Sequence, residues 1–167
     1  MKKKTMKKII ITLVIFEFIF LSINITLAKK IKINPEEYIY ASVEEQNILN
    51  LINKYRQNNG LKPLMFDSRL QDLARLKAND LENNNYFSHT SPNLGTPFEM
   101  LKNNTVKYKI AGENLAGNIN EENAVIAWIN SPSHRDNILE KDFEYTGISV
   151  IQSKTYGKIF VQLFIGL

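Results

Sequence analysis

The chain has 167 residues, with 21 lysines and arginines, 17 acidic residues and no cysteine, for a formal charge of +4. Residues 1–28 hold five of the lysines and one of the acids, so the other 139 residues carry 16 basic and 16 acidic groups. A neutral domain of this length can bury one hydrophobic core, but it lacks the basic surface that nucleic-acid binding needs. The absence of cysteine excludes disulfides, thiol nucleophiles and thiolate metal sites.

The first 28 residues have the pattern of a secretory signal peptide. A lysine-rich stretch over residues 2–8 precedes an apolar run over residues 9–27, and the small-x-small sequence that ends at Ala28 is typical of a signal-peptidase site. The run approaches the ~20 residues that span a bilayer, but Glu17 near its centre opposes a retained anchor. We expect cleavage after Ala28, with an uncleaved membrane anchor as the alternative. Either outcome places the rest of the chain outside the cytoplasm.

Two helices are predicted in the first half of the remaining chain. Ser42 and Glu45 form a capping box, and apolar residues at helical spacing follow it. Gly60 predicts the end of this helix, because glycine readily adopts the left-handed conformation of a helix C-terminus. Asp67 is predicted to cap a second helix, which ends before three consecutive asparagines.

Two further helices and a β-hairpin are predicted in the second half. Thr96 begins a capping box for a short helix over residues 97–101, and a fourth helix is predicted over residues 121–130. Residues 145–152 and 158–167 are β-branched and aromatic runs joined by five turn residues. The second run is nearly all apolar, so we expect it to be buried on both faces by helices on both sides of the sheet. The fold class is therefore α+β.

Three residues could carry chemistry. The only two histidines, His89 and His134, each lie in a polar, proline-containing segment that we interpret as a loop, and Glu113 lies between them in an otherwise uncharged stretch. Their spacing matches no local metal motif such as HExxH. Either the three residues converge on one site, or the histidines bond to loop backbone while Glu113 caps a backbone group or pairs with Arg135.

Six short sequences, taken in order, resemble one known family. They are residues 50–56 (NLINKYR), 87–89 (FSH), 95–98 (GTPF), 111–116 (AGENLA), 127–139 (AWINSPSHRDNIL) and 145–148 (YTGI). The set is similar to the CAP superfamily of cysteine-rich secretory, antigen 5 and pathogenesis-related 1 proteins, and in particular to its bacterial SCP-like extracellular branch. The resemblance implies a lead-in over residues 29–43 and a CAP domain over residues 44–167.

The resemblance also implies a fold and a site. The fold is a three-layer α-β-α sandwich with a small antiparallel sheet between helical layers. The site is a cleft where two histidines and two acidic residues converge. His89, Glu113 and His134 match three of these positions, and Ser131 stands at the fourth, as is usual in the bacterial branch. Asn114 is expected to support the cleft through hydrogen bonds to loop backbone.

Zn²⁺ is the cofactor that such a cleft would hold, through His89 and His134. Two neutral imidazoles and water can coordinate Zn²⁺, whereas catalytic zinc usually has three protein ligands. Glu113 is then either the third ligand or a partner that orients a histidine, and Ser131 could hydrogen-bond a metal-bound water. Because the second carboxylate is missing, we expect modest affinity that is lost as the histidines protonate near pH ~6.5.

Three functions are compatible with this cleft. We expect a secreted or surface-attached binding module without catalytic activity, whose cleft accepts a lipid or a cell-envelope ligand. The alternative is a metal-assisted, protease-like hydrolase in which Glu113 activates a zinc-bound water, and the missing carboxylate argues against it. A third is a structural protein of the envelope or spore surface, in which the cleft has no function. Membrane association is expected only if the leader is uncleaved.

Overall fold

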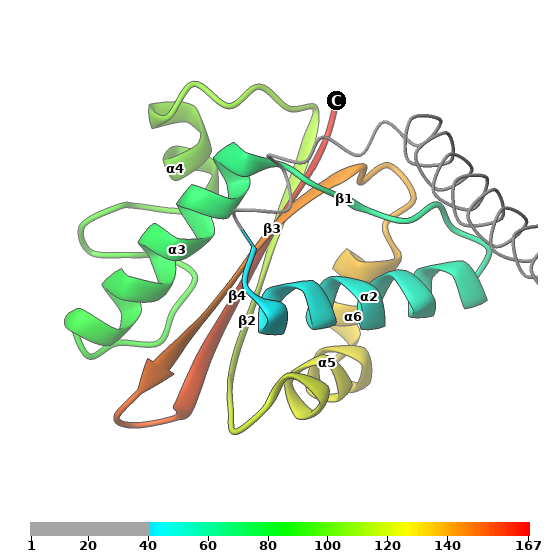
Figure 1. The fold of residues 1–167 in the computed structure, drawn as a ribbon. Helices are drawn as coiled ribbons and strands as arrows, with labels where there is room; N and C mark the ends of the chain where they lie inside the picture. Colours follow the sequence, from blue (N-terminus) through cyan, green and yellow to red (C-terminus); the bar gives the residue numbers. More distant parts are fainter. Residues whose placement is uncertain (1–40) are drawn as a thin grey trace, which may run out of the picture. The chain divides into compact units, whose positions relative to one another are not determined.

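A four-stranded sheet lies between two layers of helices in the computed structural model, which describes residues 41–167 (Figure 1). The strands are β1 (Met65–Phe66), β2 (Ile110–Asn118), β3 (Tyr145–Ser153) and β4 (Gly157–Gly166), in the spatial order β1-β3-β4-β2. Strands β3, β4 and β2 pair antiparallel, whereas β1 is parallel to β3. The predicted sandwich is therefore confirmed, and the sheet includes one short parallel strand.

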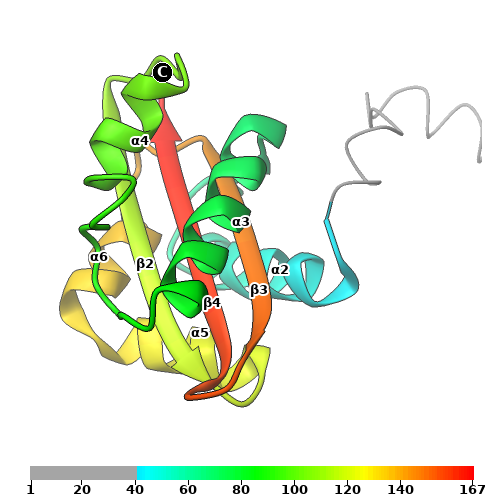
Figure 2. The same ribbon diagram turned by 90° about the vertical axis from the view of Figure 1, so that its left-hand side faces the viewer.

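The helices divide between the two faces of the sheet. Helices α2 (Val43–Asn58), α5 (Glu121–Asn130) and α6 (Pro132–Leu139) cover one face, and α3 (Ser68–Asn83) and α4 (Pro97–Asn103) cover the other (Figure 2). Helix α3 packs mainly on β3 and β4, while α5 and α6 contact β2. The two sides of β2 therefore face helices that come from different parts of the chain.

Strand β4 supplies both halves of the hydrophobic core. Phe160 and Phe164 pack among α2, α5 and α6, whereas Val161, Leu163 and Ile165 pack under α3 and α4. All five residues are fully buried. Because successive side chains of a strand point to opposite faces, an unbroken apolar run was the expected pattern for a strand covered on both sides, and this prediction is confirmed.

The predicted helix ends are confirmed with small shifts. Ser42 and Glu45 form the reciprocal capping box of α2, and Gly60 has the positive φ of 75° that favours glycine after a helix. The side chain of Asp67 accepts from two backbone N–H groups at the start of α3. Helix α5 has the predicted bounds, whereas α4 continues to Asn103, two residues beyond the predicted end.

Two elements depart from the sequence-based expectations. Residues around His134 form helix α6 and not a loop, with Ser131 at its N-cap and Pro132 at the first helical position. Pro132 fits there because the first turn of a helix does not use that N–H group. Strand β2 was not predicted from its residues, because Gly112 and Gly117 have low strand propensity.

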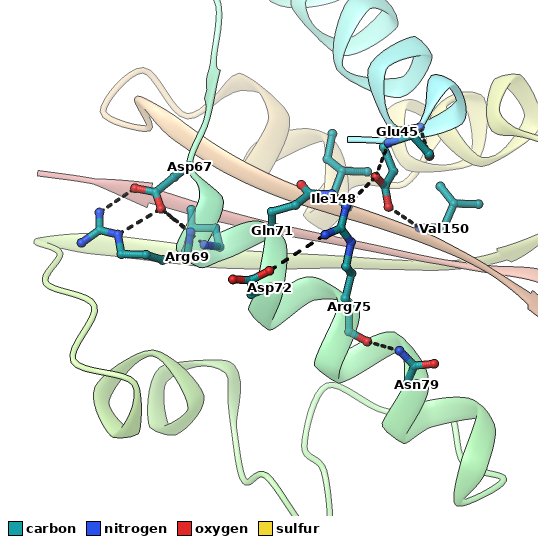
Figure 3. A network of polar contacts seen from close by, with 11 residues as sticks. Glu45, Asp67, Arg69, Gln71, Asp72, Arg75, Asn79, Ile148 and Val150 are labelled. Atoms are coloured by element: carbon teal, nitrogen blue, oxygen red, sulfur yellow. Dashed lines mark hydrogen bonds and ion pairs between the residues drawn. The ribbon is translucent and has the colours of Figure 1, made fainter. Parts of the chain in front are cut away.

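Side chains close the part of the β3 edge that lies beyond β1 (Figure 3). The Gln71 side chain accepts from the Ile148 N–H at 2.9 Å and donates to the Ile148 carbonyl, so it bonds the strand as a neighbouring strand would. Glu45 accepts from the Val150 N–H at 3.4 Å. An open strand edge invites pairing with other chains, and these two buried side chains remove that opportunity.

Arg56, on the last turn of α2, is a fully buried cation that joins three chain segments. Its guanidinium donates to the carbonyls of Lys62 (2.9 Å), Ile138 (2.7 Å), Glu140 (2.9 Å) and Phe143 (3.2 Å). These acceptors lie before β1, at the end of α6 and before β3. The fork of the guanidinium therefore fixes irregular backbone that no helix or strand bonds satisfy.

The predicted leader and most of the lead-in, residues 1–40, fall outside the described residues. None of the helices in residues 41–167 combines the length and the apolar character needed to cross a membrane.

We expect Arg56→Lys to lower the free energy of unfolding by about 2–4 kcal/mol, because one ammonium cannot satisfy four carbonyls that the guanidinium holds. Urea denaturation would measure the change. Arg69→Lys is the control, since the Arg69 side chain is 55% exposed and, within residues 41–167, forms an ion pair only with Asp67. The free energy of unfolding of this variant should fall by less than about 1 kcal/mol. Equal losses in the two variants would contradict the assigned role of Arg56.

Candidate functional site

The site forms at the free edge of strand β2. Within residues 41–167, β2 has a neighbouring strand on one side only. The loop between α3 and α4, which carries His89, lies on one face of β2, and α6, which carries His134, lies on the other (Figure 2). The two imidazole rings meet across this edge, with their centroids 6.4 Å apart. Residues that are 45 positions apart in the sequence are thus brought together by the sandwich.

Glu113 fixes the His89 ring. Its Oε1 lies 2.7 Å from His89 Nδ1, and the carboxylate is 2% exposed whereas the imidazole is 53% exposed. When Glu113 is ionised its carboxylate must accept, so a neutral His89 ring then carries its proton on Nδ1 and leaves the lone pair of Nε2 free. Of His89, Glu113 and His134, only His89 and Glu113 share a direct side-chain hydrogen bond within the described residues.

The second oxygen of Glu113 has no hydrogen-bond partner within the described residues, although it is buried. Burial raises the pKa of this carboxyl above 4.5, and the hydrogen bond from His89 and the charge of Lys77 offset the rise only in part. Glu113 thus has one oxygen on His89 and one oxygen that solvent does not reach.

His134 is held from the opposite face of β2. Asn114, the next residue after Glu113, points to that face because strand side chains alternate. Its Nδ2 donates to the His134 carbonyl at 3.1 Å, and its Oδ1 accepts from Asn137 at 2.9 Å. Asn137 also donates to the Glu113 carbonyl at 3.2 Å. Asn114 therefore bonds to the backbone of helix α6, and not to loop backbone as expected.

The environment of His134 favours its neutral form. Burial lowers its pKa below 6.5, and the neighbouring His89 lowers it further. A neutral imidazole is the form that coordinates a metal ion. Ser131 lies one turn earlier at the N-cap of α6, and its hydroxyl caps no backbone N–H.

The histidine pair has the nitrogen donors for a zinc site, but its two rings lie farther apart than two rings that share one zinc ion. Two imidazoles on one tetrahedral Zn²⁺, with Zn–N bonds of about 2.0–2.1 Å, have ring centroids about 5 Å apart. The observed separation is 6.4 Å, so the rings would need to approach by about 1 Å. Within residues 41–167, no three or more histidine and acidic side chains lie close enough together to hold a metal ion as they stand.

Sequence reasoning missed Lys77, a fully buried lysine on α3. Its Nζ donates to the backbone carbonyls of Ser88 (2.8 Å) and His89 (3.0 Å). A signal was present, because Lys77 follows Leu70 and Ala74 at helical spacing on the apolar stripe of α3. A charged residue in such a stripe indicates a buried polar contact.

An aromatic pair lies on the face of β2 to which Glu113 points. The rings of Phe87 and Tyr156 have centroids 4.9 Å apart, and the residues remain 39% and 40% exposed. Tyr156 packs over Gly117, where a Cβ atom would come within 2.9 Å of the tyrosine. Phe87 packs against Tyr156 of the β3–β4 turn while still exposing part of its ring.

The α-β-α sandwich is the fold that the resemblance to the CAP superfamily implied. The chain belongs to this family: residues 49–164 match the model of CAP, the cysteine-rich secretory protein family. The chain is 44% identical over 126 residues to the uncharacterized protein YkwD of Bacillus subtilis (strain 168), a match that covers 75% of this chain and 48% of YkwD.

Solved structures agree with this assignment. An extracellular protein containing an SCP domain from Bacillus anthracis matches with a TM-score of 0.67 and 36% identity, over 73% of this chain and 40% of that one. An outer surface protein from Borrelia burgdorferi matches with a TM-score of 0.68 and 27% identity, over 74% of this chain and 92% of that one. The chain spans about half the length of YkwD and less than half of the Bacillus anthracis chain.

We expect NMR titration to give His134 a pKa below 6.5, and His89→Ala to raise it only part of the way back, because burial is the larger cause. Since the folded state then binds this proton less readily than the unfolded chain, His134 makes stability fall as the pH drops below about 6.5. The two-histidine sequence makes the ring signals simple to assign. A His134 pKa above 6.5 would contradict the described burial.

Proposed function

We propose that this CAP domain is a secreted or surface-attached binding module. Its histidine site organises a divalent metal, with Zn²⁺ the best match, through Nε2 of His89 and a nitrogen of His134, and the domain accepts a lipid or cell-envelope ligand. The location draws support from similar proteins that are described as extracellular or as outer surface proteins. The observation that carries the proposal is the contact of Glu113 with His89 Nδ1, which leaves Nε2 directed away from the carboxylate.

A carboxylate that orients a metal-binding histidine through its other nitrogen is a recurrent arrangement in metal sites. It fixes the tautomer and makes the free nitrogen more basic. Glu113 occupies that position toward His89, and Asn114 holds the backbone of His134. When bound, the ion would supply a positive charge with open positions for water or an oxygen-containing ligand.

The partly apolar surroundings support a ligand that is not purely polar. Binding sites commonly combine a few placed polar groups with apolar walls. Phe87, which precedes His89 by two residues, and Tyr156, in the β3–β4 turn, pack together and offer such a wall, and both are about two-fifths exposed. A lipid chain or the less polar face of an envelope glycan would suit these rings.

The hydrolase alternative rests on the raised pKa of Glu113 and its free oxygen, two features that a general base requires. Access argues against it. The free oxygen is buried, and the other oxygen is engaged by His89. A base for a zinc-bound water must reach that water, so the geometry favours an orienting role for Glu113 over proton abstraction.

We expect calorimetric titration of the purified protein at pH 7.5 to show saturable 1:1 binding of Zn²⁺ with an affinity on the order of micromolar. The double variant His89→Ala, His134→Ala should lose this binding, since the sequence has no other histidine. Asp136→Asn is the control, because Asp136 is an exposed acid on the same helix as His134. Binding that survives in the double variant, or that is absent in the wild type, would refute the metal site.

Glu113→Gln distinguishes the two functions. An orienting role predicts that Zn²⁺ affinity falls about 10–100-fold, because a neutral amide holds the His89 tautomer less well. A hydrolase role predicts nearly unchanged affinity and the loss of turnover on a peptide or ester substrate. Zinc calorimetry and a peptidase assay on the same preparation would measure both, with thermal unfolding as the check on folding.

A further inference from the structure

Helix α3 reaches beneath the His89 loop with two charged side chains, one helical turn apart. Lys77 donates to the carbonyls of Ser88 at 2.8 Å and His89 at 3.0 Å, and to the Tyr86 hydroxyl at 3.1 Å. Asp80 accepts from the same Tyr86 hydroxyl. The tyrosine hydroxyl thereby connects the two charges, and it acts as acceptor toward one and donor toward the other.

Asp80 secures the far end of the loop. Its carboxylate accepts from the Ser91 hydroxyl at 2.6 Å and from Asn93 Nδ2 at 3.0 Å. The Ser91 oxygen in turn accepts from the Asn93 and Leu94 N–H groups at 3.0 Å and 2.8 Å. Residues 86–94 contain no helix, and their only strand-like residue is the single bridge position Ser91. Side-chain hydrogen bonds therefore take the place of a backbone ladder in this loop.

Lys77 is poorly suited to a purely stabilising role. It is fully buried, and among the described residues no carboxylate oxygen lies within 4 Å of its Nζ. Burial lowers its pKa, and only the more distant charges of Glu113 and Asp80 oppose this. Burying a cation costs free energy that an apolar side chain on the same helical stripe would not incur.

The groups that Lys77 contacts give it a different role. A hydrogen bond to the His89 carbonyl fixes the peptide plane that follows the His89 Cα atom, and a second bond to the Ser88 carbonyl fixes the plane before it. With both planes fixed, the direction of the His89 Cβ atom is set. Burial and Asp80 raise the pKa of Tyr86 to about 12, so its hydroxyl stays protonated and the connection to Asp80 persists at neutral pH.

We propose that Lys77 and Asp80 form a clamp that positions His89 so that Nδ1 meets Glu113 and Nε2 stays free for a metal ion. This inference rests on the proposed metal site and names the residues outside it that give the site its geometry. The clamp lies on one helical layer, whereas His134 is held from the other. Its loss should therefore affect the His89 half of the site alone.

The test uses Lys77→Met, which keeps most of the buried volume and removes the three donors. We expect Zn²⁺ affinity to fall at least about tenfold and amide hydrogen exchange in residues 86–94 to accelerate, while exchange in α6 stays unchanged. The thermal midpoint should change little, because the cost of burying the cation is also removed. Lys102→Met, at an exposed lysine of α4, should change none of these quantities.

A milder variant covers the case in which Lys77→Met does not fold. Tyr86→Phe removes only the hydroxyl that connects Lys77 to Asp80, so it should produce a smaller loss of affinity and faster exchange in the same loop. Wild-type Zn²⁺ affinity and loop exchange in either folded variant would overturn the clamp. So would a loss of protection spread evenly over the domain, since this indicates general destabilisation.

The failure of the clamp can be told apart from the failure of the metal site. If the wild type binds no Zn²⁺, the proposed metal site is wrong, yet the ¹⁵N shifts of His89 in the metal-free protein still report whether Nδ1 carries the proton. We expect Lys77→Met to shift His89 toward a mixture of tautomers and to leave His134 unaffected. An unchanged His89 tautomer together with unchanged loop exchange would refute the clamp by itself.

Discussion

The alternation of side chains along one edge strand determines where everything in the site lies. Glu113 and Asn114 are consecutive in β2, so they must point to opposite faces of the sheet. One reaches His89 from the layer of α3, and the other reaches the backbone of His134 from the layer of α6. Because β2 has no strand on its outer side within residues 41–167, the two rings meet around its edge. A central strand would have kept them apart.

Buried cations on backbone carbonyls connect the irregular segments to this framework. Arg56 holds four carbonyls around the ends of α2 and α6, and Lys77 holds two in the His89 loop. Both side chains are fully buried. Carbonyls in loops lack ladder partners and would be costly to bury alone, so one cation that satisfies several of them fixes a segment at once. In a domain without cysteine, such contacts provide the cross-links between segments that disulfides provide elsewhere.

Local signals in the sequence were enough for the elements with strong ends or strong periodicity. The capping box at Ser42, the cap at Asp67 and the doubly buried run of β4 each follow from a few neighbouring residues. Strand β2 does not follow from its neighbouring residues in this way, because its glycines make room for side chains from elsewhere in the chain. Gly112 lies against Asn137 and Phe143, and Gly117 lies under Tyr156. Residue identity alone does not reveal which side chain a glycine accommodates.

The candidate site, too, could be predicted only in part from the sequence. His89, Glu113 and His134 could be named from motifs in family order, but the clamp could not, since Lys77 belongs to no motif and gains its meaning from the loop above it. The two imidazoles are anchored to opposite layers, so their 6.4 Å separation is a property of the packing of α3 and α6 against one strand. A metal that draws the rings together must move one anchored group or the other. The affinity for the metal therefore depends on how tightly each helical layer holds its histidine. The histidine that is easier to move determines the free-energy cost of bringing the two rings together.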